Sequence, residues 1–183
     1  MTDIEILADL VAYITRGVRK TIVGLSAQEM AWQPDVEGNS IGVTVWHCSR
    51  VLDVLKVQFL EQQPAVAEQW HTQGWARKTG YDPRGIGADG LGMLTGYTPE
   101  EVAAIPTLTV EEQLAYLDQV GGALYQYILA LPEGALTQIN TATERTQTGY
   151  ELLRGMLLAS IAHLGEIRAL KALQDRAAQR SLS

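Results

Sequence analysis

Four stretches of this chain place apolar residues at alternating steps of three and four, the spacing that lines one face of an α-helix. They span about residues 3–25, 41–62, 109–131 and 150–178. No stretch shows the sustained alternation that a half-buried β-strand needs. The pattern therefore predicts an all-α protein in which four long amphipathic helices form a bundle around one core.

Turn-forming and capping residues indicate where these helices begin and end. Asn39 or Ser40 is the expected N-cap of the second helix, and Thr109 that of the third, because their side chains accept hydrogen bonds from free backbone amides. Pro64 follows the second helix. Gly121 and Gly122 lie in the middle of the third helix, where each glycine costs about 1 kcal/mol relative to alanine. We therefore expect a close helix contact at these two glycines. The segment after residue 174 is polar and is expected to fray.

Residues 64–107 form a long connection between the second and third helices, rich in glycine and proline. Connections of this length are uncommon in compact proteins and are usually functional or partly structured. Burial of the large rings of Trp70 and Trp75 is favourable, so we expect this segment to pack onto the bundle. Its length also permits a helix order other than simple up-down-up-down. We interpret residues 1–183 as one domain.

Composition limits the partners of the chain. Fourteen Lys and Arg residues against twenty-one Asp and Glu give a net charge of −7, with no basic run. Nucleic acid and anionic membranes are therefore not expected as partners. No apolar run approaches the roughly 20 residues of a membrane-spanning helix. The single cysteine, Cys48, excludes an internal disulfide and is interpreted as a packed thiol. These features predict a cytoplasmic protein.

Three side chains are the candidates for a functional site. His47 lies on the apolar face of the second helix, and His163 and Glu166 share one strip of the fourth, because they are three residues apart. If the two helices are neighbours, the three could bind Zn, Ni, Fe or Mn and leave positions open for water. The alternative is that each histidine is a hydrogen-bonded core residue and that Glu166 is solvated. A phosphate loop, a dinucleotide-type glycine turn, G-x-S-x-G and paired-cysteine zinc motifs are missing from the sequence.

Three other polar residues are interpreted more simply. Arg50 and Asp53 are one turn apart on the second helix and are expected to form an ordinary surface pair. His71 lies in the long connection, where it could reach the site as a ligand, although a loop histidine outside any motif is usually just exposed.

Two short motifs resemble those of a known family. The segment Asn39-Ser40-Ile41-Gly42-Val43-Thr44-Val45-Trp46-His47, with Arg50-Val51 and Asp53 after it, is similar to the second-helix signature of the DinB-like superfamily. His163-Leu164-Gly165-Glu166-Ile167 resembles the fourth-helix pattern H-x-G-[EQ]-I of the same family. The superfamily includes damage-inducible DinB-like proteins and mycothiol-dependent maleylpyruvate isomerase.

The resemblance implies a four-helix bundle, often a homodimer, that holds a divalent metal between one histidine of the second helix and an H-x-x-x-H pair of the fourth. His47 matches the first ligand and His163 the last, but the middle position is Ala159, which cannot bind metal. Glu166, Ser160, His71 or water would have to replace it, or metal affinity has been lost. Characterised members of the family use low-molecular-weight thiols as cosubstrates.

Two functions follow as hypotheses. The first is a metal-dependent thiol transferase or hydrolase acting on a small molecule, with His47, His163 and Glu166 at a variant metal site. The second is a non-catalytic bundle that binds a small apolar ligand or serves dimerisation. The alanine at the middle ligand position favours the second.

Overall fold

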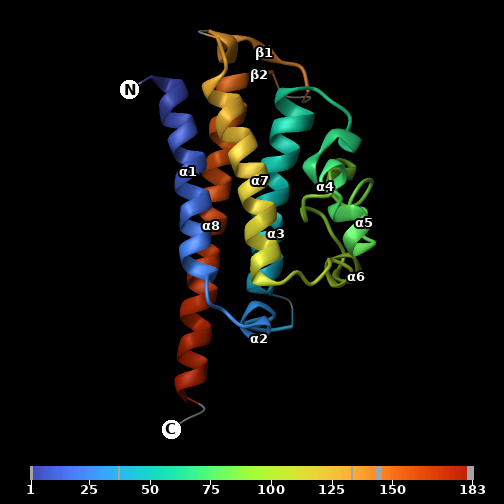
Figure 1. The fold of residues 1–183 in the computed structure, drawn as a ribbon, viewed down its shortest axis with the longest axis vertical. Coiled ribbons are helices and arrows are strands. Elements are labelled where there is room, and N and C mark those ends of the chain that lie inside the picture. Colours follow the sequence, from blue (N-terminus) through green and yellow to red (C-terminus); the bar gives the residue numbers. More distant parts are fainter. Residues whose placement is uncertain (1, 37, 133, 143–145, 181–183) are drawn as a thin grey trace.

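The computed structural model describes residues 2–36, 38–132, 134–142 and 146–180. Four long helices form a bundle (Figure 1): α1 (Asp3–Ile22), α3 (Ile41–Val54), α7 (Val110–Leu129) and α8 (Gly149–Arg180). Helices α1 and α3 each pack against both α7 and α8, and so occupy opposite corners of the bundle. The prediction of an all-α four-helix bundle is confirmed.

The order of the helices is not simple up-down-up-down. Helices α1 and α8 run in one direction, while α3 and α7 run in the other, as the colours in Figure 1 show. The parallel pair α3 and α7 is possible because the long connection returns the chain to the end of the bundle where α3 began. As a result α3 and α8, which carry the two candidate histidines, are antiparallel neighbours.

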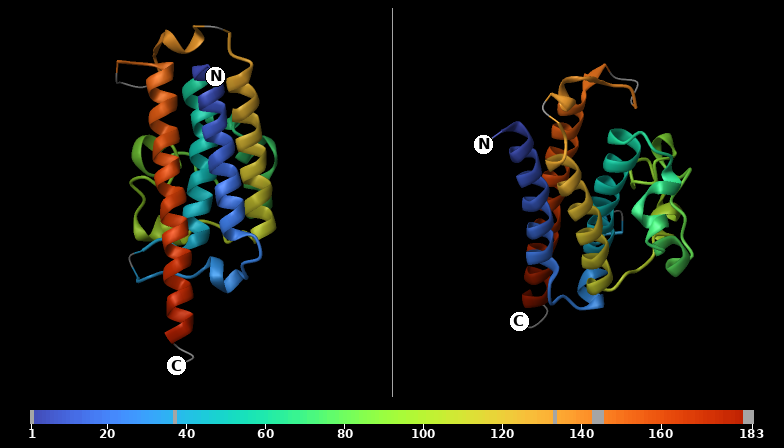
Figure 2. Two further views of the ribbon diagram at one scale, coloured as in Figure 1. Left: turned by 90° about the vertical axis from the view of Figure 1, so that its left-hand side faces the viewer. Right: turned by 45° about the horizontal axis from the view of Figure 1, so that its top comes forward.

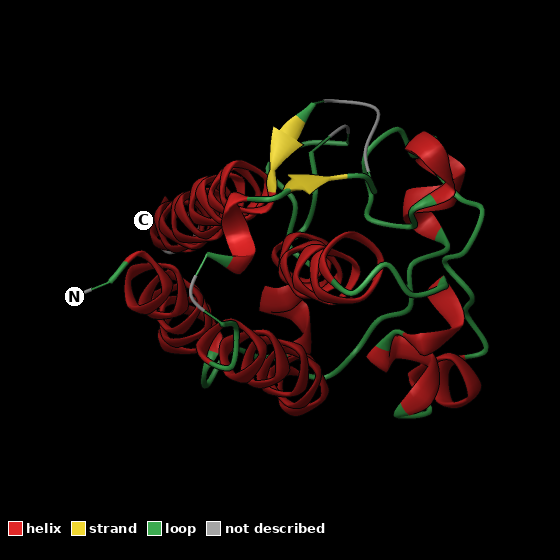
Figure 3. Ribbon diagram, turned by 90° about the horizontal axis from the view of Figure 1, so that it is seen from above, coloured by secondary structure: helices red, strands yellow, loops and turns green. Residues whose placement is uncertain are grey.

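The long connection carries short helices and covers the side of the bundle next to α3 and α7 (Figure 3). Its helical segments are η2 (Ala65–Ala67), α4 (Gln69–Thr72), α5 (Trp75–Thr79), η3 (Ala88–Gly90) and α6 (Pro99–Ala103). Trp70 is fully buried and Trp75 is 6% exposed. The expectation that these tryptophans attach the connection to the bundle is confirmed.

Capping side chains begin the helices where the sequence predicts. The Ser40 hydroxyl accepts a hydrogen bond from the Val43 amide, and Thr109 forms a capping box with Glu112 at the start of α7. Gly121 provides the expected close contact, because a Cβ atom there would lie 2.4 Å from the Cγ2 atom of Thr15 on α1.

Three helix ends differ from the prediction. Helix α1 ends at Ile22, because the chain turns at Gly24 with φ of +85° before the short helix α2 (Ala27–Met30). Helix α3 ends as an α-helix at Val54 and continues as a π-helical segment, η1 (Leu55–Leu60). Helix α8 continues to Arg180, so the fraying expected after Gln174 is not found in the described part of the helix.

A small hairpin between α7 and α8 closes one end of the bundle (Figure 2). It follows η4 (Ala135–Thr137) and consists of β1 (Ile139–Asn140) and β2 (Gln147–Thr148), with Ile139 paired to Thr148 in antiparallel register. Strands of two residues are too short to show alternation, so the sequence pattern did not reveal them. Among the described helices, none is both long and apolar enough to cross a membrane.

Candidate functional site

His47 and His163 come together between α3 and α8. Their Nε2 atoms lie 3.0 Å apart and their rings are nearly perpendicular, with an interplanar angle of 86°. His47 is buried, being 5% exposed, whereas the side chain of His163 is 31% exposed. The helical spacing and the antiparallel contact of α3 with α8 therefore bring two residues 116 positions apart to one point.

The partners of the other two ring nitrogens determine where the protons lie. Nδ1 of His163 is 3.0 Å from a carboxylate oxygen of Glu166, which can only accept a hydrogen bond when ionised, so Nδ1 carries the proton. The backbone of Met93 lies near the His47 ring, but Nδ1 of His47 has no hydrogen bond of standard geometry. With its proton on Nδ1, His163 presents the lone pair of its Nε2 atom to Nε2 of His47.

Burial keeps the His47 ring neutral. Burial and, to a smaller extent, the nearby His163 lower the pKa of His47 to about 4, although the backbone of Met93 acts to raise it. A neutral imidazole with a free lone pair is the form that binds a metal ion. At neutral pH, His47 is therefore in a state suited to a ligand.

The two imidazoles form the floor of a pocket of about 260 Å³. One wall comes from α3 and the residue before its cap, one from α8, and one from the long connection. The lining residues are Asn39, Thr44, His47, Leu94, Thr95, His163 and Glu166. Leu94 has φ of +79°, a conformation that is strained for any residue except glycine. Such strain is often found at binding sites.

Comparison with known proteins places the fold and the family. The family model described as the DinB superfamily matches residues 14–167. The chain belongs to the DinB superfamily. A solved structure, the crystal structure of a conserved protein from Enterococcus faecalis, is similar over 94% of this chain and 97% of its own, with a TM-score of 0.78 and 18% sequence identity. No curated protein matches the chain in sequence.

Behind the histidines of this DinB-superfamily chain lies a buried ion cluster, formed by Arg50, Asp53, Glu68 and Tyr116. Each of the four residues is at most 1% exposed. Nη2 of Arg50 is 2.8 Å from Glu68, and Tyr116 donates a hydrogen bond to Asp53 over 2.9 Å. The interpretation of Arg50 and Asp53 as a surface pair is therefore wrong.

The ion cluster connects α3 to the pocket wall. Asp53 accepts hydrogen bonds from the backbone amides of Gln69 and Trp70 at the start of α4. Nε of Arg50 donates to the carbonyl of Gly92 over 3.1 Å. Burial lowers the pKa of Arg50, but the nearby Tyr116 hydroxyl and the carboxylates of Glu68 and Asp53 outweigh it and raise that pKa, so the guanidinium stays charged. Arg50 thus holds the chain two residues before Leu94.

The other residues considered as replacement ligands lie elsewhere. His71 is beside the ion cluster, with Nε2 3.9 Å from Glu68. Ser160 is buried and donates its hydroxyl proton to the Met156 carbonyl. Ala159 is exposed. Among the described residues, no group of three or more His, Cys, Asp or Glu side chains could hold a metal ion. The histidine pair therefore offers two ligands at most from this set.

Cys48 is a packed thiol, as predicted. It is fully buried, and burial, together with a smaller effect of Glu166, raises the pKa of its thiol to about 12.

Some lining residues escaped the sequence reasoning. Thr44 lies three residues before His47 on the same helix face, so helical spacing alone could have found it. Leu94 and Thr95 come from a segment without periodicity, and no sequence pattern indicates that they reach the histidines.

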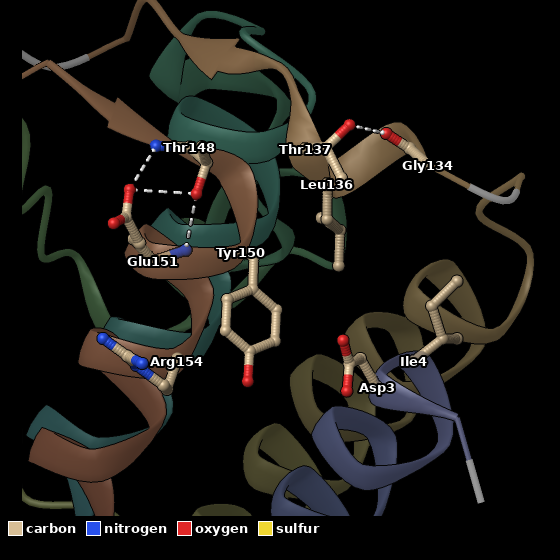
Figure 4. Close-up of a pocket in the computed structure, with 9 residues that line it drawn as sticks. All are labelled: Asp3, Ile4, Gly134, Leu136, Thr137, Thr148, Tyr150, Glu151 and Arg154. Carbon is tan, nitrogen blue, oxygen red and sulfur yellow. Dashed lines mark hydrogen bonds between the residues drawn. The ribbon is translucent and has the colours of Figure 1, made fainter.

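A second hollow, of about 420 Å³, lies at the hairpin end of the bundle (Figure 4). Several of its polar groups are used locally. Thr148 and Glu151 bond each other at the start of α8, and Thr137 donates to the carbonyl of Gly134. Asp3, Tyr150 and Arg154 also line this hollow, which contains no imidazole.

Proposed function

We propose that the pocket between α3 and α8 binds a divalent metal ion through Nε2 of His47 and Nε2 of His163, and a small molecule beside it. The observation that carries the proposal is the approach of these two nitrogens to 3.0 Å. Two nitrogens at this separation match neighbouring positions around an ion with metal–nitrogen bonds of about 2.1 Å.

Glu166 is proposed to act through His163. By accepting the proton of Nδ1, the carboxylate fixes the ring orientation and makes Nε2 a better donor. This role replaces our expectation that Glu166 itself is a ligand. Thr44 donates its hydroxyl proton to the Ser40 carbonyl, so its oxygen can accept a hydrogen bond from a bound molecule. The remaining coordination positions fall to water or substrate.

The reaction classes that suit this arrangement are thiol transfer and hydrolysis. A bound divalent ion supplies a Lewis acid that lowers the pKa of a thiol or a water molecule. The chain contributes two neutral imidazoles, one oriented by Glu166, and a pocket of about 260 Å³. That volume suits the reactive end of a low-molecular-weight thiol or of a small substrate, rather than a macromolecule. We propose that the protein works in the cytoplasm, where thiols are kept reduced.

Metal titration tests the proposal. Full-length protein, freed of any affinity tag and treated with chelator, is titrated with Zn²⁺, Ni²⁺ and Mn²⁺ by calorimetry and thermal unfolding. We expect about one ion per chain and a raised melting temperature, since binding to the folded state alone stabilises it. His47→Ala and His163→Ala should each abolish the effect. His71→Ala is the matched control and should retain it. Binding that is absent in the parent, or unchanged in His47→Ala, would refute the proposal.

A second candidate function is a ligand-binding bundle without catalysis. Ala159 favours it, because the described residues provide no third protein ligand. Only the first function, the enzyme, involves catalytic turnover of a substrate. A metal-loaded enzyme should consume a chlorinated aromatic electrophile with a thiol, or a p-nitrophenyl ester with water. His163→Ala should then lose this rate, whereas a binding module would show none above the metal ion alone.

We also propose a homodimer, formed through the outward face of α8. Leu158 is 54% exposed there, and Ala162 and Gly165 lie on the same side and are exposed. Small residues allow close helix contact, and an exposed leucine gains from burial. Light scattering should give twice the chain mass, and Leu158→Glu should give the single-chain mass. A parent protein of single-chain mass would contradict the dimer.

A further inference from the structure

A larger hollow, of about 830 Å³, lies further toward the start of α8. Its walls come from η1, from the long connection, from the segment around β2, and from α8. The apolar lining residues are Phe59, Leu91, Met93, Ala142, Leu152, Gly155 and Met156. A volume of this size accommodates the body of a drug-sized molecule.

This hollow and the histidine pocket lie on the same face of α8. With 3.6 residues per turn, Leu152, Met156 and His163 point within about 40° of one another. Met156 and His163 are seven residues apart, which is about 10 Å along the helix axis at 1.5 Å per residue. Between them, Ala159 points into the same sector and is exposed. A single methyl group is thus the side chain that α8 places in this sector between the two hollows.

The two hollows also share the wall that lies opposite α8. Met93 lines the larger hollow, and the next two residues, Leu94 and Thr95, line the histidine pocket. Helix α3 with its extension does the same, because His47 lines one hollow and Phe59 the other. The two hollows therefore follow one another between the same pair of walls.

We propose that the two hollows form one groove across Ala159, which binds an uncharged, elongated molecule with an aryl or branched apolar body. The body lies between Met93 and Met156, and a neutral polar end such as a hydroxyl or thiol reaches the imidazoles. The inference rests on the proposed function, in that it takes the histidine pair as the reactive end. Ala159, which stands at the position of the family's middle metal ligand, is then also the residue that opens the groove.

The lining chemistry selects this class of ligand. Methionine sulfur makes favourable contacts with aromatic rings, and Phe59 adds a ring of its own. Asp89, Glu151 and Glu166 line the two hollows, whereas no Lys or Arg is among their described lining residues. An anionic ligand would therefore be repelled along the groove. A cationic end at the histidines would compete with a divalent ion, which leaves an uncharged end.

The test uses 6-phenylhexan-1-ol, whose length suits the span from Met156 to His163. Its binding to the full chain is followed in chelator by calorimetry and by the histidine ring signals in NMR spectra. We expect saturable binding that shifts the ring signals of His47 and His163. The matched anion 7-phenylheptanoate should bind about fivefold or more weakly, owing to the carboxylates. Equal affinity for the two probes would overturn the assignment.

Ala159→Trp should block the groove and weaken binding of the alcohol about tenfold. Ala172→Trp is the matched control, because it is exposed on the opposite side of α8 and should change binding by less than about twofold. Met156→Gln tests the apolar end without changing the side-chain length and should also weaken binding. Circular dichroism confirms that each variant is folded. Ala159→Trp that binds as tightly as the parent would overturn the groove, and so would retention of affinity in Met156→Gln.

The metal titration is a separate experiment, so the two proposals fail in distinguishable ways. Alcohol binding that depends on Ala159 in a protein without metal affinity supports the groove and refutes the metal site. Metal binding through His47 without alcohol binding refutes the groove and leaves the metal site standing.

Discussion

The ion cluster and the histidine pair lie one helical turn apart on α3, yet they differ in how their polar atoms are satisfied. Arg50 and Asp53 face buried partners on the long connection and on α7. Nε2 of His47 faces Nε2 of His163 beside an open pocket. Buried charges that have partners hold a structure in place, whereas converging groups that can still bind a ligand are available for function. Both kinds of site contain strongly shifted pKa values, so a shifted pKa alone does not distinguish them.

The largest effect is expected from Arg50→Met, which leaves two carboxylates of the ion cluster without their cation. Breaking a buried ion pair on one side costs about 3–5 kcal/mol. Urea unfolding should show a loss of this order. Arg84→Met is the control, since its partner Asp82 is at the surface, and it should cause no measurable loss. A stable Arg50→Met protein would show that the cluster does not anchor the long connection.

A smaller effect is expected where the ion cluster meets the pocket wall. Gly92 has φ of +64°, and a Cβ atom there would lie 2.4 Å from the Pro83 carbonyl oxygen. Gly92→Ala should cost about 1–3 kcal/mol and should also weaken metal binding, because the chain leads directly to Leu94. Gly122→Ala, in the open middle of α7, should instead stabilise by up to about 1 kcal/mol. Chemical unfolding gives the change in unfolding free energy for both variants. A loss at Gly92 with a gain at Gly122 shows that the cost comes from the backbone conformation of the pocket wall and not from replacing glycine as such.

Glu166→Gln tests the histidine side of the comparison. The amide keeps the size of the side chain but supports the His163 ring less strongly than a carboxylate does. We expect Zn²⁺ affinity to fall about tenfold, with no measurable change in the free energy of unfolding, because Glu166 is partly exposed. Asp175→Asn, on the same helix, is the control. Unchanged Zn²⁺ affinity would remove Glu166 from the site.

The smallest effect is expected at Cys48, the neighbour of His47 in sequence. Since burial raises the pKa of the thiol to about 12, almost no thiolate exists at pH 8. A thiol reagent should therefore react negligibly with the folded protein and with one thiol per chain in urea. Rapid reaction in the absence of urea would mean that the interior beside His47 opens readily.

The sequence predicts the bundle and the approach of the histidines better than it predicts the ion cluster. Spacing places His47 and His163 on helix faces, and the family motifs pair those helices. By contrast, Arg50 and Asp53 look like any i, i+3 surface pair. Their burial depends on Glu68 and Trp70, which follow in a segment without periodicity. The strained Leu94 and the π-helical segment Leu55–Leu60 leave no pattern at all, because both result from tertiary contacts.

Helix α8 follows the other three long helices in the sequence, and it brings the second histidine. During synthesis, His47 emerges early and stays without its partner until more than a hundred further residues have left the ribosome. A chain that stops after α7 has all four residues of the ion cluster but only one of the two imidazoles. Binding at that pair therefore becomes possible only once α8 has been made, and a bound ion would hold α8 against the rest of the bundle.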